Sequence, residues 1–105
     1  MKPARLRPQA LADRREEVRY YRRQASLAVA EKMIAASRKA LDQIEHDPGI
    51  GSHRIGELLG IPDLKCWRMT GFPLVWFYFE RDDSLDVVRL LGERQDIMAI
   101  LGDNS

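Results

Sequence analysis

The sequence predicts an α+β protein, with helices on one side of a small antiparallel sheet. Two observations lead to this class. Residues 9–46 carry apolar side chains at the three- and four-residue spacing of helices. Residues 64–91 hold aromatic and β-branched runs between turn signals, which is typical of strands. A chain of 105 residues can bury one core but not two, so we expect a single domain over residues 1–105.

The helices are expected in the first half of the chain. A short strand over residues 4–8 comes first and should lie at a sheet edge or end there, because its proline cannot donate a ladder hydrogen bond. The helical pattern then runs from residue 9 to about residue 24, and again from about Leu27 to His46. Ser26 can cap the second helix. The alanines of this helix allow the two helices to pack closely as an antiparallel hairpin. The Asp-Pro-Gly sequence at 47–49 ends it.

The strands are expected in the second half of the chain. Residues 50–63 form a glycine-punctuated connection with room for one helical turn at Ile55–Leu59, and Glu93–Leu101 can close the chain as a short helix. Between them lie three strands of an antiparallel meander, joined by a glycine turn and a polar turn. Their predicted bounds are Leu64–Thr70, Phe72–Glu80 and Leu85–Leu91.

The middle strand has almost no polar positions, so both of its faces should be covered. By alternation, Val75, Phe77 and Phe79 share one side and Leu74, Trp76 and Tyr78 share the other. One set should face the helical hairpin. The other set is covered either by the 50–63 connection and the C-terminal segment, or by a partner protein, since so short a chain has little left to cover it. The candidates for binding a partner are therefore Trp67, Trp76 and Tyr78.

The formal net charge of +1 hides an asymmetry between the two parts of the chain. Residues 1–39 carry eleven Lys and Arg against four Asp and Glu, whereas residues 40–105 carry six against twelve. Arg15, Arg19 and Arg22 share one face of the first predicted helix. Such a face can meet an acidic partner segment or a nucleic-acid backbone. Contact with solvent alone is the commoner explanation for a basic face that is interleaved with glutamates.

The composition disfavours several other classes of protein. The lone Cys66 excludes an internal disulfide, which fits a reducing compartment. No apolar stretch follows the basic N-terminal residues, and the longest apolar run is six residues. We therefore expect neither a signal peptide nor a membrane span, and a cytoplasmic location. His46 and His53 lack further ligands at the spacing of metal sites, so no metal and no other cofactor is expected.

Several segments carry a family resemblance. The most specific are Trp67-Arg68-Met69, Gly71 to Tyr78, Leu85 to Leu91 and Glu93-Arg94-Gln95-Asp96-Ile97, with weaker support from Leu6 to Asp13, Pro48 and Gly51. In these segments the chain resembles the ParE toxins of bacterial type II toxin–antitoxin systems, within the RelE/ParE superfamily. The resemblance covers almost the whole chain. One departure is Gly92, where chains of this family often have a histidine.

The resemblance implies a toxin that is neutralised by a cognate antitoxin, a ParD-like ribbon-helix-helix protein with a disordered tail. It also implies that the free toxin binds DNA gyrase and stabilises its cleaved-DNA state. No chemistry by this chain and no direct sequence-specific nucleic-acid binding is then expected. Arg68 and Arg94 are the candidates for toxicity. The candidates for antitoxin binding are Trp67, Trp76, Tyr78, Arg15, Arg19 and Arg22.

The alternative is a ribosome-dependent mRNA endonuclease of RelE type. Such an enzyme needs cations on the phosphate and side chains that move protons. Arginines are available, but residues 95–105 contain no Tyr, His or Lys. We therefore expect a binding protein rather than an enzyme. A toxin-like fold that has lost toxicity is a third interpretation, for which Gly92 is mild support.

Overall fold

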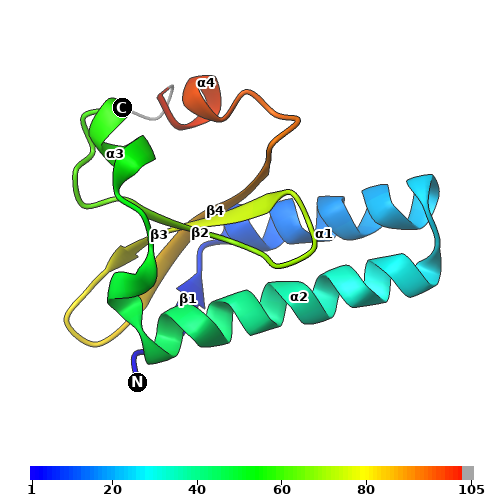
Figure 1. The fold of residues 1–105 in the computed structure, drawn as a ribbon, viewed down its shortest axis with the longest axis horizontal. Coiled ribbons are helices and arrows are strands. Elements are labelled where there is room, and N and C mark those ends of the chain that lie inside the picture. The colour runs from blue at the N-terminus through cyan, green and yellow to red at the C-terminus, as the bar shows by residue number, and fades with distance from the viewer. Residues whose placement is uncertain (103–105) are drawn as a thin grey trace.

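The computed structural model describes residues 1–102 and combines a helical hairpin, a four-stranded sheet and two short helices (Figure 1). The helices are α1 (Pro8–Gln24), α2 (Leu27–His46), α3 (Arg54–Leu58) and α4 (Ile97–Gly102), with one 3₁₀ turn, η1, at Pro48–Ile50. The strands are β1 (Ala4–Leu6), β2 (Lys65–Arg68), β3 (Leu74–Glu80) and β4 (Leu85–Gly92). The predicted fold class is confirmed, and α2 has the predicted bounds.

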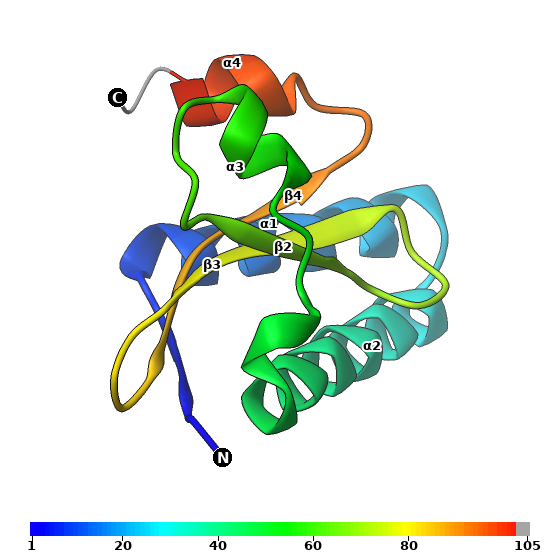
Figure 2. The same cartoon turned by 60° about the vertical axis from the view of Figure 1, so that its left-hand side comes forward.

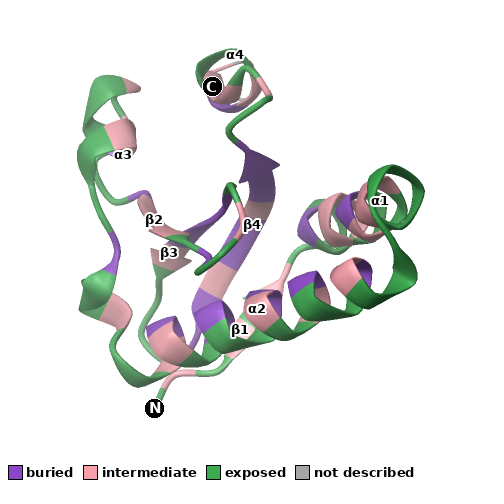
Figure 3. Ribbon diagram, turned by 45° about the vertical axis from the view of Figure 1, so that its right-hand side comes forward, coloured by how far each residue is buried: buried purple, intermediate pink, exposed green. Residues whose placement is uncertain are grey.

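The two long helices have well-defined ends. Pro8 stands at the first position of α1, where a missing N–H costs nothing. Ser26 caps α2, because its Oγ accepts a hydrogen bond from the Val29 N–H at 3.1 Å. Pro48 follows the last turn of α2 and starts η1. The buried residues of both helices lie on the side toward the sheet, and the opposite sides are exposed (Figure 3).

The sheet is mixed, which corrects the prediction of a wholly antiparallel sheet. Its strand order is β1-β4-β3-β2, and β1 lies parallel to β4 while the other two pairs are antiparallel. The expected edge position of β1 is confirmed. The Arg7 N–H, at the start of α1, continues this parallel pairing by bonding the Val87 carbonyl at 2.9 Å. Strand β2 ends at Arg68, earlier than predicted, because the chain turns toward β3 at Gly71, which has a φ of 86°.

One face of the sheet packs on the helical hairpin. Trp76 and Tyr78 of β3 point toward α1 and α2, and both are 0% exposed. They form one core with Met33 and Ile44 of α2, among others. The Trp76 indole N–H donates to the Ser37 carbonyl at 3.2 Å, so its one polar group is satisfied inside this core.

The other face of the sheet is covered by the short helices α3 and α4, so the molecule has three layers (Figures 1 and 2). Val75 and Phe77 form a second core with Leu64, which precedes β2, and Leu101 of α4. Phe77 is 0% exposed in this core. The expectation that the chain leaves one sheet face for a partner to cover is therefore wrong. Of the two alternatives, cover by the 50–63 connection and the C-terminal segment is the one that the structure shows.

The Tyr78 hydroxyl fastens the loop after α2 to the sheet. It donates to the Pro48 carbonyl at 2.7 Å and accepts from the Gly51 N–H at 3.2 Å. A Cβ atom at position 51 would collide with this hydroxyl, so the site requires glycine. Pro48 and Gly51, which belong to the family resemblance, thus provide the hydrogen-bond partners of a buried tyrosine hydroxyl. Burial raises the pKa of Tyr78 to about 12.

This pKa predicts that the protein loses stability at alkaline pH. An unfolded tyrosine ionises near pH 10, so between about pH 10 and about pH 12 unfolding releases a proton from Tyr78. Its contribution is complete below about pH 10, and the free energy of unfolding should then fall by roughly 1.4 kcal/mol per pH unit. Urea unfolding of wild type and Tyr78→Phe on both sides of pH 10 measures this slope. The prediction fails if the two proteins lose stability equally with pH.

Candidate functional site

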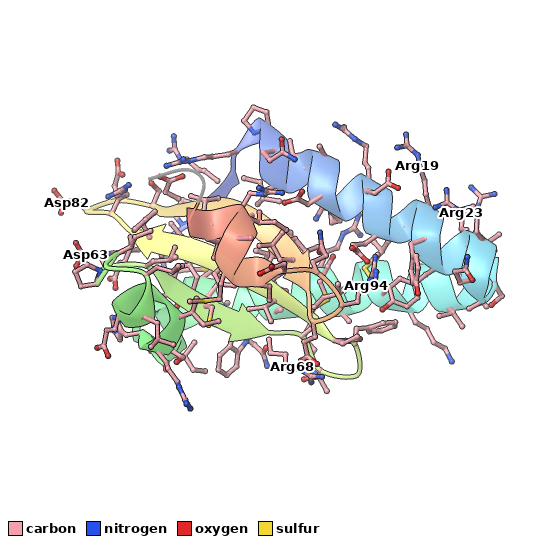
Figure 4. The ribbon with its side chains drawn as sticks, turned by 90° about the horizontal axis from the view of Figure 1, so that it is seen from above. Arg19, Arg23, Asp63, Arg68, Asp82 and Arg94 are labelled. Atoms are coloured by element: carbon pink, nitrogen blue, oxygen red, sulfur yellow. The ribbon has the colours of Figure 1, made fainter. Side chains whose placement is uncertain are left out.

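The two candidates for toxicity lie at one end of the sheet, where β2 and β4 end and β3 begins (Figure 4). We call this region the arginine end; it comprises Arg68, Arg94, Glu93, Glu17 and Tyr20. Arg68 donates from Nε to Glu93 Oε1 at 2.8 Å, and both side chains are 54% exposed. A pair this exposed contributes little to stability. The Arg68 guanidinium is therefore free to exchange Glu93 for an acceptor on a partner.

Arg94 is held more firmly than Arg68. Its Nη2 donates to both carboxylate oxygens of Glu17 at 2.9 Å, and its guanidinium lies 3.9 Å from the centroid of the Tyr20 ring. The Glu17 side chain is only 5% exposed, so its charge needs a nearby cation, which Arg94 supplies. The Arg94 side chain remains 40% exposed. It thus presents a guanidinium in a fixed position to the solvent.

Gly92 makes room for this arrangement. A Cβ atom at position 92 would lie 3.2 Å from both Arg94 Nη1 and Leu74 Cδ2, which is tight enough to press on the guanidinium. The Gly92 N–H also donates to Gln95 Oε1, which fixes the turn after β4. The departure from the family's histidine therefore has a local physical counterpart: in this chain the glycine leaves space for Arg94.

A second ion pair fastens α1 to β4. Asp13 accepts from Arg89 Nε at 2.8 Å, from Arg89 Nη2 at 3.1 Å and from the Leu90 N–H at 3.0 Å. Together with the pair between Glu17 and Arg94, it joins the inward carboxylates of α1 to two arginines of the C-terminal half. Sequence reasoning assigned Asp13 to a family motif but not to this pair. The four-residue spacing of the two acids on one helical face was the signal that could have found it.

The candidates for antitoxin binding fall into two groups. Trp76 and Tyr78 are 0% exposed, so the prediction that they lie at an accessible surface is wrong; they are packing residues of the hairpin core. Trp67 is partly exposed, and its Nε1–H donates to Gln43 Oε1 at 2.9 Å. The remaining three, Arg15, Arg19 and Arg22, are exposed on α1. They do not join the arginine end, because they lie on the side of α1 opposite Glu17.

Sequence reasoning also missed an open cavity of about 540 Å³. Its lining combines apolar and polar side chains: Ile61, Leu64, Phe79, Val88 and Leu101, with Arg7, Arg89 and Gln9. The Arg7 guanidinium is held by Asp86 through two hydrogen bonds, of 2.8 and 2.9 Å, which raises the pKa of Arg7 and lowers that of Asp86. The residues come from segments far apart in the sequence, so no local pattern marks the cavity.

Within residues 1–102, no three His, Cys, Asp or Glu side chains are grouped as metal ligands. No helix of this part is long and apolar enough to cross a membrane.

The fold is shared with a known protein system. A chain of the solved structure "Chromosomal ParDE TA system from P. aeruginosa" matches with a TM-score of 0.74 and 14% sequence identity, over 88% of this chain and 96% of that chain. The chain therefore has the fold of that protein, a helical hairpin on a short mixed sheet. The family model described as "ParE toxin of type II toxin-antitoxin system, parDE" matches residues 4–97, and the chain belongs to this family. No curated protein matches the sequence.

Proposed function

We propose that this chain is a toxin that is neutralised by a cognate ParD-like antitoxin and that acts in the cytoplasm by binding DNA gyrase and stabilising its cleaved-DNA state. Membership of the ParE family over residues 4–97 carries the proposal. The arginine end is the proposed contact with the target. Arg94 is pre-positioned by Glu17, and Arg68 has only an exposed partner to give up. Binding then costs little reorganisation of the toxin.

Binding is favoured over RNA cleavage by the protonation chemistry of this region. Cleavage would need a group that accepts a proton near neutral pH. Burial and the Glu17 carboxylate raise the pKa of Tyr21, so even less of this tyrosine is ionised and able to accept a proton near neutral pH. Arg89 is only 19% exposed and is already paired with Asp13, so its charge is less available to a phosphate. An endonuclease of RelE type is thus the less favoured function.

The open cavity is the proposed contact with the antitoxin. Phe79 and Val88 offer apolar contacts, and Arg7, whose side chain is 52% exposed beside Asp86, offers a positive charge. A disordered acidic tail loses conformational entropy when it folds on binding, so it needs apolar anchors as well as charge. A cavity that combines both fits such a tail. Trp67 and the exposed arginines of α1 remain candidates for further contacts.

The proposed function predicts that the purified chain acts on gyrase without cutting RNA. Supercoiling by purified gyrase should be inhibited and cleaved DNA should accumulate, while messages in a translation extract stay intact. Arg68→Ala should weaken inhibition about tenfold, equivalent to roughly 1.4 kcal/mol of binding free energy. Arg54→Ala, which removes an exposed arginine of α3 instead, is the matched control and should inhibit like the wild type. Cleaved messages with unaffected gyrase would overturn the proposal in favour of the endonuclease.

A further inference from the structure

The helical hairpin carries most of its positive charge on the outside. Within residues 8–46 there are eight Lys and Arg and six Asp and Glu, a formal excess of only two. Three of the acids are turned inward: Asp13 binds Arg89, Glu17 binds Arg94, and Glu45 accepts the Ala4 N–H. Eight cations and three carboxylates are left for the outer surface. The inward ion pairs therefore make the outside of the hairpin much more basic than its composition suggests.

Two of these cations repel each other. Arg14 of α1 and Arg38 of α2 lie on two helices that pack together, and burial with the charge of Arg38 lowers the pKa of Arg14. Neither side chain has a hydrogen-bond or ion-pair partner among residues 1–102. An anion between them would relieve this repulsion.

Three more arginines form a row on the outer side of α1. Arg15, Arg19 and Arg22 are exposed, and only Arg19 has a carboxylate partner, Glu16, at 3.4 Å. Arg19 extends away from the sheet in Figure 4. The row spans about 10 Å at the rise of an α-helix, a length over which duplex DNA carries roughly six negative charges. We call Arg14, Arg15, Arg19, Arg22 and Arg38 the basic hairpin face.

The chemistry of this face selects one kind of partner. Leu11 and Leu27 are the only large hydrophobic residues of the hairpin that are strongly exposed, at 37% and 56%. An acidic protein segment that folds on binding needs apolar anchors, which this face hardly offers. A rigid polyanion needs none, because the release of its counterions drives binding. Guanidinium groups also bind phosphate oxygens in pairs.

We propose that the basic hairpin face binds the phosphate backbone of duplex DNA without reading its sequence. The row on α1 follows one strand of phosphates, and Arg14 with Arg38 adds to the positive charge of the hairpin. The inference stands on the charges of the hairpin and does not rest on gyrase as the target. If the face only contacted solvent, substitutions at these positions would not change the affinity for DNA. The proposal requires an affinity for DNA that depends on these arginines and falls with salt.

The test compares two double variants that remove the same charge. Arg15→Gln/Arg22→Gln alters the face, and Arg5→Gln/Arg54→Gln removes two exposed arginines elsewhere. All four side chains are exposed and without an ion-pair partner among residues 1–102, so both variants should fold, as circular dichroism will check. Fluorescence anisotropy with a labelled duplex of arbitrary sequence gives the affinity of the full chain over a range of salt concentrations.

The wild type should bind the duplex with an affinity that falls steeply with salt. The hairpin double should bind about tenfold more weakly at low salt, and its salt slope should be smaller by about two. The control double should match the wild type. If both double variants weakened DNA binding equally, binding would depend only on net charge and the proposal would be overturned. Wild-type binding that is insensitive to salt would overturn it as well. If the hairpin double variant no longer binds a glutamate-rich peptide but binds DNA like the wild type, the proposal is overturned and the face binds a protein partner instead.

Discussion

Replacement of Trp76 by alanine is expected to lower the free energy of unfolding by about 3–5 kcal/mol. Trp76 is 0% exposed, fills the core between β3 and the hairpin, and donates its indole N–H to the Ser37 carbonyl. Its loss leaves a large cavity and removes the indole hydrogen bond to a carbonyl of α2. A domain of this size has only about 5–15 kcal/mol to lose, so much of the variant should be unfolded on modest warming. Urea unfolding followed by circular dichroism measures the change.

The matched control for this prediction is Trp67→Ala. Trp67 is also a β-strand tryptophan with a hydrogen-bonded indole, but it is partly exposed at the edge of the hairpin core. Its replacement should cost clearly less stability than that of Trp76. If Trp76→Ala instead remained as stable as wild type and lost only its partner, Trp76 would be a surface residue and the three-layer packing would be wrong.

Replacement of Arg94 by methionine is expected to cost about 2–4 kcal/mol, because it strands the Glu17 carboxylate in the interior. This loss of unfolding free energy is smaller than that expected for a fully buried ion pair, since the Arg94 side chain is 40% exposed. Adding Glu17→Gln to Arg94→Met should recover most of the loss, because the buried group is then neutral. Urea unfolding of the wild type, both single variants and the double variant completes a double-mutant cycle.

This cycle also separates stability from toxicity at the arginine end. Arg68→Ala is the control, because its pair with Glu93 is exposed and should change stability by less than about 1 kcal/mol. If the stable double variant at positions 17 and 94 is still harmless in cells, the Arg94 guanidinium contacts the target directly. No recovery of stability in the double variant would show that Glu17 does not depend on Arg94 for its burial.

The parts of the fold that depend on local signals could be predicted. Ser26 and the Asp-Pro-Gly sequence at 47–49 fix the ends of α2 through residues that are close in the sequence. The helix begins and ends where the sequence predicted. The direction of β1 could not be predicted, since it depends on its pairing with distant β4, in which Ala4 lies opposite Leu85. The spacing of Asp13 and Glu17 marks two acids on one helical face, but it does not indicate that the partner of Glu17 is Arg94, 77 positions later.

The cover on the second face of the sheet was left as one of two alternatives for a different physical reason. It is built from single apolar residues of two short segments, including Ile55 and Leu59 near α3 and Ile97 and Ile100 near α4. Five- and six-residue helices have too few turns to show an apolar period. The strongly apolar β3 correctly indicated that two covers were needed, and the sequence pattern alone could not show that the chain supplies both.

The parallel pairing of β1 with β4 also governs when the toxin is assembled during its synthesis. Ala4 pairs with Leu85, so β1 cannot pair until most of the polypeptide, including β4, has been translated. At roughly 5–20 residues per second, this delay lasts several seconds. Closing so long a loop is also entropically slow compared with forming the hairpin. A nascent chain therefore carries an incomplete sheet, and the arginine end, which needs the end of β4, is among the last parts to form.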